Sequence, residues 1–103
     1  WVMALMEISI VPVGTGKASV SDYVAAAVRV LESKGAKYQV TAMGTIVEGE
    51  TEELLRLALE MQEAVFNMGV SRIVTKINLD ERRDKRMTME SKVEAVREKM
   101  RQG

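Results

Sequence analysis

The 103-residue sequence contains neither cysteine nor histidine. The absence of thiol groups excludes disulfides, thiolate nucleophiles, zinc–thiolate sites and iron–sulfur clusters. The absence of imidazole groups excludes histidine-based metal sites and Ser–His catalytic arrangements, and it leaves no side chain that titrates near neutral pH when unperturbed. Acid–base chemistry would have to use carboxylates, lysine or tyrosine. We therefore expect a protein that is not an enzyme and that has no metal site.

Aromatic residues and a surplus of charge are also lacking. Phe, Trp and Tyr together make up 4% of the chain, and 15 Lys and Arg residues balance 15 Asp and Glu residues. RNA-binding domains with a four-stranded sheet stack bases on aromatic side chains, and contacts to phosphates need a basic surface. We therefore expect no nucleic-acid partner.

Long hydrophobic runs are missing from the sequence as well. No stretch approaches the roughly 18 apolar residues of a membrane-spanning helix. The apolar segment 3–13 carries Glu7 in its middle and follows no basic region, unlike a signal peptide. We expect a cytoplasmic protein with no membrane partner, and we expect Trp1 and Val2 to be additions before a natural start at Met3.

The residues that are present fit one folded domain. The chain is 47% hydrophobic and 29% charged, which is typical of a single globular domain, here spanning residues 1–103. A domain of this size buries only about two-thirds of its unfolded surface, so a surplus apolar face is commonly covered by another subunit. Oligomerisation is therefore expected.

Hydrophobic periodicity and turn residues predict four strands and three helices. The expected strands cover Ala4–Val13, Lys37–Met43, Thr45–Glu48 and Ser71–Asp80. The expected helices cover Asp22–Lys34, a segment from the acidic residues 48–53 to about Met68, and a C-terminal segment from Thr88. This order predicts an α+β fold, a ferredoxin-like βαββαβ antiparallel sheet with an added C-terminal helix.

Local signals mark the ends of the helices. Ser19 and Asp22 have the spacing of a capping box before the first helix, and Gly35 and Gly69 suit the left-handed position that ends a helix. Apolar residues recur at helical spacing in the second and third helices. They are Leu54, Ala58, Met61, Val65 and Met68 in the second, and Met89, Val93, Val96 and Met100 in the third.

Two surfaces of the predicted fold have an unusual composition. With both crossover helices on one side, the other side of the sheet is left bare. It should carry Leu5, Glu7, Ser9, Val11, Gln39, Thr41, Met43, Val74 and Lys76, with Ile73, Thr75, Ile77 and Leu79 facing the helices. This mixture suggests subunit pairing or a ligand surface. Residues 80–86 are nearly all charged and of mixed sign, and they predict a self-neutralising solvated turn or an ion-pair network between subunits.

Four short motifs occur in a specific order along the chain. They are Pro12-x-Gly14-Thr15, Ser19-x-Ser21-x-Tyr23-Val24-Ala25, Tyr38-x4-Met43-Gly44-Thr45 and Arg72-x-Val74-x5-Asp80-x-Arg82-Arg83-Asp84. With this set the chain resembles the small thiamine-binding protein family of bacteria, archaea and yeast, from Met3 to about Met100. The resemblance implies a ferredoxin-like subunit, a homotetramer built as a dimer of dimers, and non-enzymatic binding of thiamine or its hydroxymethylpyrimidine precursor.

The residues also indicate how such a ligand would be held. An aminopyrimidine–thiazolium molecule needs an aromatic or thioether wall, polar groups along the pyrimidine edge and a carboxylate near the positive ring. The expected ligand-binding residues are Thr15, Ser19, Ser21, Tyr23, Val24, Met43, Gly44, Thr45 and Glu48, with Glu7 as the alternative carboxylate. They should meet where the first loop and the first helix approach the 43–45 turn. No cofactor is expected besides this ligand.

Two other interpretations stay open at this point. The first is an oligomeric regulatory or structural ferredoxin-like module that has no specific thiamine ligand and uses its bare sheet face only to join subunits. The second is an enzyme in which a glutamate, Lys17 or Tyr23 acts as acid or base.

Overall fold

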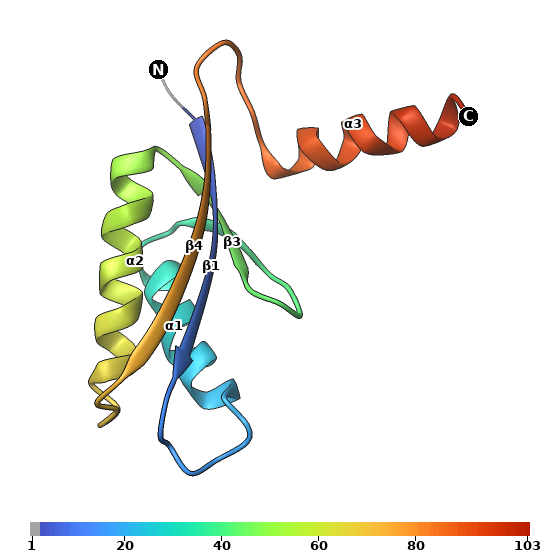
Figure 1. Cartoon of the computed structure of the whole chain (residues 1–103). Helices are drawn as coiled ribbons and strands as arrows, with labels where there is room; N and C mark the ends of the chain where they lie inside the picture. Colours follow the sequence, from blue (N-terminus) through green and yellow to red (C-terminus); the bar gives the residue numbers. More distant parts are fainter. Residues whose placement is uncertain (1–2) are drawn as a thin grey trace.

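A computed structural model describes residues 3–103. Trp1 and Val2, which we expected to be additions before a natural start at Met3, lie outside the described residues. The strands are β1 (Met3–Pro12), β2 (Lys37–Val40), β3 (Thr45–Gly49) and β4 (Ile73–Arg82), in the sheet order β2-β3-β1-β4. The helices are α1 (Ser21–Ser33), α2 (Thr51–Phe66) and α3 (Met89–Arg101). Helices α1 and α2 cover one face of the antiparallel sheet, while α3 extends away from it (Figure 1). The predicted ferredoxin-like α+β fold with an added C-terminal helix is confirmed.

The core lies between the two crossover helices and the central strand. Successive side chains of a strand point to opposite faces, so Met6, Ile8 and Ile10 of β1 all face the helices and are buried. From α2, Leu54 and Met61 pack against them. The apolar pattern of β1 and α2 therefore predicted the core correctly.

The ends of the helices differ in part from the prediction. Gly35 and Gly69 adopt the expected positive φ angles of 67° and 94°. The predicted capping box of α1 is wrong: the helix begins one residue earlier than expected, so Val20 is the N-cap and no side chain caps it. A capping box exists instead at α3, between Thr88 and Ser91.

The hairpin between β2 and β3 turns earlier than the sequence suggested. Strand β2 ends at Val40 because the Thr41 N–H donates to the Gly44 carbonyl at 2.8 Å, and the Thr41 hydroxyl donates to the same oxygen at 2.7 Å. Met43, predicted in a strand on the bare sheet face, is instead 84% exposed at the tip of this turn.

Other apolar side chains are more exposed than predicted. Ile77 and Leu79 were expected to face inward, but both remain partly exposed because β4 is an edge strand with a neighbour on one side only. Met68 is exposed because α2 ends before it, at Phe66. In α3 only Met89 of the predicted stripe is buried, and Met100 at its far end is 74% exposed.

Candidate functional site

A cavity of about 250 Å³ opens between β1, the turn 41–44 and the beginning of α1. Its walls are formed by Ile8, Ser9, Ile10, Val11, Val20, Val24, Ala27, Thr41, Ala42, Met43, Gly44, Thr45 and Met61. Among these residues none is charged, and hydroxyl groups and main-chain groups provide the polar surface. The cavity therefore suits a small, uncharged ring better than a charged group.

The cavity exists because two neighbouring strands differ in length. The β1–β3 ladder ends at the pair Ile8 and Thr45, whereas the β1–β4 ladder continues to Pro12. Beyond Ile8, the side of β1 that faced β3 has no strand beside it. Three consecutive residues, 9–11, line the cavity, and consecutive side chains point to opposite faces, so β1 meets the cavity along its open edge.

Gly44 allows the turn to lie close against β1. A Cβ atom at this position would lie 3.1 Å from the Ile8 carbonyl oxygen and 3.4 Å from the Glu7 Cγ. The first of these separations is tighter than ordinary van der Waals contact with a main-chain atom, so a larger residue would push the turn away. Glycine therefore fixes the width of the cavity on this side.

Two threonines supply hydroxyl groups to the cavity wall. Thr41 closes the turn, since its hydroxyl also accepts hydrogen bonds from the N–H groups of Met43 at 3.3 Å and Gly44 at 3.2 Å. Thr45 is 4% exposed and is a buried polar residue at the end of β3. Thr45 also lines the cavity, so its side chain is a candidate partner for the polar edge of a ligand.

The structure brings together part of the predicted site. Val24, Met43, Gly44 and Thr45 line the cavity, at the place expected from the sequence. The other predicted residues do not line it. Thr15 and Ser19 lie in the segment before α1, and Ser21 is the first residue of that helix, with its hydroxyl 3.2 Å from that of Ser19. Tyr23 packs against the core.

Glu48 lies on the opposite face of the sheet. Its side chain is only 7% exposed, one carboxylate oxygen accepts a hydrogen bond from the Met89 N–H at 2.9 Å, and the other lies 3.2 Å from the Lys37 Nζ. Lys37 also bonds Glu90 at 2.5 Å, and this contact chiefly raises the pKa of Lys37 and lowers the pKa of Glu90. Glu48 therefore anchors the beginning of α3 and does not line the cavity.

Several cavity residues were missed by the sequence analysis. Ile8, Ile10 and Met61 were assigned to the core, to which they do belong, and Thr41 was assigned to the bare face. The signal that could have identified Thr41 is its spacing from Gly44, since a Thr two residues before a hairpin tip can close the turn with its hydroxyl.

A second hollow of about 310 Å³ lies on the reverse face of the sheet, beside α3. It is lined by Leu5, Glu7, Ile46, Asn78, Leu79, Asp80, Met89, Lys92 and Val93. Its two carboxylates already have partners, because Asn78 donates to Glu7 at 3.0 Å and Lys92 to Asp80 at 2.6 Å. This hollow is therefore less suited than the first to a ligand that needs free polar groups.

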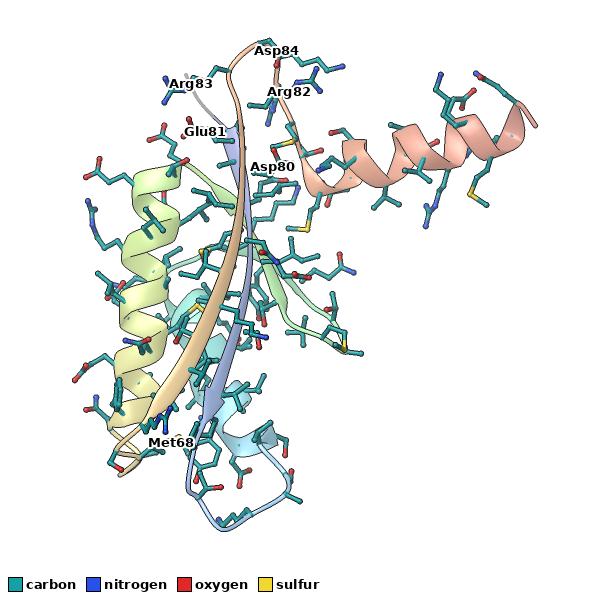
Figure 2. All side chains as sticks on the ribbon, viewed as in Figure 1. Met68, Asp80, Glu81, Arg82, Arg83 and Asp84 are labelled. Carbon is teal, nitrogen blue, oxygen red and sulfur yellow. The ribbon has the colours of Figure 1, made fainter. Side chains whose placement is uncertain are left out.

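The charged segment 80–86 pairs largely with itself. Figure 2 shows Asp80–Asp84 at the end of β4 opposite to Met68. Arg82 binds both carboxylate oxygens of Asp84, at 2.5 and 2.9 Å, and Arg83 binds Glu81 at 2.7 Å. The Arg82 guanidinium lowers the pKa of Asp84 to about 2. These pairs agree with the predicted self-neutralising turn.

Within residues 3–103, no three carboxylate side chains gather in a way that could hold a metal ion. In the same range, every helix is too short or too polar to cross a membrane.

The fold and the cavity define a class of protein: a ferredoxin-like α+β domain with a small uncharged cavity at the open edge of its central strand. The sequence model of a family described as "Thiamine-binding protein" matches residues 6–97. The chain belongs to this family, which is named for binding rather than for a reaction.

Relatives of known name cover nearly the whole chain. The UPF0045 protein YqgV of Bacillus subtilis is 44% identical over 98 residues, which cover 91% of this chain and 94% of that protein. A UPF0045 protein of Methanothermobacter thermautotrophicus is 38% identical over 99 residues, which cover 95% of this chain and 100% of that protein.

Solved structures show the same fold. The hypothetical protein MJ1052 of Methanocaldococcus jannaschii superposes with a TM-score of 0.84 at 40% identity, over 91% of this chain and 95% of that one. A candidate thiamine biosynthesis or salvage protein of Thermotoga maritima gives a TM-score of 0.77 at 26% identity, over 91% of this chain and 98% of that one.

Proposed function

We propose that the protein binds thiamine, or its hydroxymethylpyrimidine precursor, in the cavity between β1, α1 and the turn 41–44, and releases it unchanged. The role would be sequestration, delivery or sensing in the cytoplasm, by a homotetramer. The observation that carries the proposal is the uncharged cavity at the open edge of β1, in a chain of the thiamine-binding family.

The size and polarity of the cavity favour the pyrimidine ring as the buried part. Its volume of about 250 Å³ is below the range of roughly 300–1,000 Å³ typical of ligand pockets, so one ring and its substituents fit better than the whole vitamin. The cationic thiazolium would remain at the mouth, where the exposed Met43 thioether provides a polarisable wall. Glu7, the alternative carboxylate, lines the second hollow on the reverse face and accepts a hydrogen bond from Asn78, so it does not line this cavity.

The lining also favours binding over turnover. General acid–base catalysis needs a titratable group within hydrogen-bond reach of the reacting atom. The cavity residues offer hydroxyls and main-chain groups but no carboxylate, amine or phenol. Such a wall can orient a heterocycle by hydrogen bonds, and it lacks a group that would activate water or a nucleophile against it.

Calorimetric titration with thiamine and with hydroxymethylpyrimidine tests the proposal. We expect heat of binding from at least one of them, and we expect Thr45→Val to weaken binding about tenfold, because it removes a hydroxyl group from a residue of the cavity wall. Thr75→Val is the matched control, since Thr75 donates to Gln62 at 2.6 Å and does not line the cavity. No heat with either compound at millimolar concentration would refute the proposal.

A second candidate function is supported by the shape of the molecule. The radius of gyration is 15.3 Å, larger than the about 13 Å of a compact domain of 100 residues, because α3 extends away from the sheet. Val93, Val96 and Met100 of α3 are exposed, as expected for a helix that packs on another subunit. A regulatory or structural module without a thiamine ligand would form oligomers in sedimentation and show no heat in the titration above.

A further inference from the structure

The direction of the main-chain groups along β1 can be fixed from two contacts. The Val13 N–H donates to the Arg72 carbonyl at 2.9 Å, so the main-chain groups of Val13 point toward the β4 side. The Ile8 carbonyl oxygen, 3.1 Å from the site of a Gly44 Cβ, points toward the β3 side. In antiparallel pairing, the N–H and C=O of one residue point to the same side and successive residues alternate. Ile10 therefore points both groups toward the β3 side.

On that side, Ile10 meets the cavity rather than a strand. The β1–β3 register ends at the pair Ile8 and Thr45, and Ile10 lines the cavity together with its two neighbours. The next residue with the same direction is Pro12, which has no N–H and so cannot extend a ladder. Within the described part of β1, Ile10 is the residue past Ile8 that presents both a donor and an acceptor at this edge.

We infer that the Ile10 main chain recognises the amino-substituted edge of a pyrimidine. The Ile10 N–H donates to the ring nitrogen beside the amino group, and the Ile10 carbonyl accepts from the amino group itself. The ligand thus takes the place that the next residue of β3 would occupy, as an added strand does in peptide recognition. The inference rests on the proposed function and adds the group that recognises the ligand: the Ile10 main chain, which selects a pyrimidine with the amino group over one without it.

This recognition explains why the cavity has few polar side chains. A paired donor and acceptor on the main chain is complementary to the adjacent amino group and ring nitrogen, and an unpaired buried main-chain group is costly. The rigid ladder to β4 holds both groups in place, since Ser9 and Val11 pair with Lys76 and Val74 on the other side of β1. Selectivity is therefore built into the strand rather than into a replaceable side chain.

The test compares two ligands by calorimetry and follows main-chain amides by NMR hydrogen exchange on the full chain. The ligands are thiamine and an analogue in which hydrogen replaces the 4-amino group. We expect the analogue to bind at least about tenfold more weakly, because the Ile10 carbonyl loses its partner. We also expect thiamine to slow exchange of the Ile10 amide at least tenfold, while the Ile8 amide, already within the β1–β3 ladder, serves as the internal control.

The outcomes separate this inference from the proposed function. Equal affinity of the two ligands, or an Ile10 amide whose exchange thiamine does not change, overturns the inference and leaves thiamine binding standing. An Ile10 amide that is fully protected without ligand overturns it too, because the edge is then already covered. Failure of both thiamine and hydroxymethylpyrimidine to bind refutes the proposed function and the inference together.

Discussion

Replacing Glu48 by alanine separates a structural role for this residue from a role in ligand binding. The Glu48 side chain lies on the reverse face of the sheet, 7% exposed, and its carboxylate accepts a hydrogen bond from the Met89 N–H. Met89 is the first residue of α3, so this N–H belongs to the turn whose donors have no partner within the helix. The carboxylate also lies at the positive end of the helix dipole.

The size of the effect follows from these contacts. Loss of a buried acceptor leaves the Met89 N–H without its partner, at a cost of about 1–3 kcal/mol in the stability of the α3 attachment. The ion pair to Lys37 adds little, because the lysine side chain is half exposed and keeps its bond to Glu90. Glu48→Gln retains a carbonyl oxygen for Met89 and should therefore cost less than Glu48→Ala.

Hydrogen exchange of the α3 amides and calorimetric titration with thiamine measure the two roles independently. We expect Glu48→Ala to speed exchange in the first turn of α3 by about tenfold or more, which corresponds to at least about 1.4 kcal/mol, and to leave thiamine affinity unchanged. An affinity loss of tenfold with α3 exchange unaltered would show that Glu48 contacts the ligand, and it would refute the placement of the site on the other face.

Two further predictions concern the core and the charged segment. Met61→Ala should lower the free energy of unfolding in urea by about 2–5 kcal/mol, because Met61 of α2 is buried in the core with β1 and also forms part of the cavity wall. Met61→Leu, which conserves volume, should lower it by less than about 1.5 kcal/mol. The Asp84 carboxyl should titrate by NMR with a pKa of about 2 rather than its ordinary 3.8, and Arg82→Ala should return the pKa toward that ordinary value. Since the folded-state pKa is lowered, the pair stabilises the fold above pH 3.8 and this contribution is lost as the pH falls through about 2; a titration near 3.8 in the unsubstituted protein would refute the pairing.

The fold could be predicted because its strongest signals are local. The alternation of Met6, Ile8 and Ile10 assigns β1 to one core face, and the glycines 35 and 69 end α1 and the α2 segment at a left-handed residue. The end of β2 could not be predicted in the same way. The alternating pattern continues through Met43, and the chain turns at Thr41 because a hydroxyl supplies a hydrogen bond that the pattern does not reveal.

For the candidate cavity, part of the lining could be predicted but not the full set of residues. Gly44 and Thr45 were recognised from the turn and line the cavity. Glu48 was predicted to line the site but lies on the opposite face of the sheet. Residues three apart in a strand point to opposite faces, so the sequence already indicates that Glu48 does not share the face of Thr45. Tyr23 was expected in the cavity wall but packs against the core.

The cavity itself results from a mismatch that no single residue reveals. The β1–β3 ladder spans Ala4–Ile8, whereas the β1–β4 ladder spans the whole of β1, and the difference leaves the edge at Ile10 open. Elsewhere an open edge of this kind invites pairing with another chain. In this chain the open edge of β1 is short, ends at a proline, and is enclosed by the turn at Gly44 and the beginning of α1. A flat ring can therefore enter beside the edge, whereas a second strand has no room to extend along it. The geometry that prevents strand addition is thus the same geometry that leaves a donor and an acceptor available to a heterocycle.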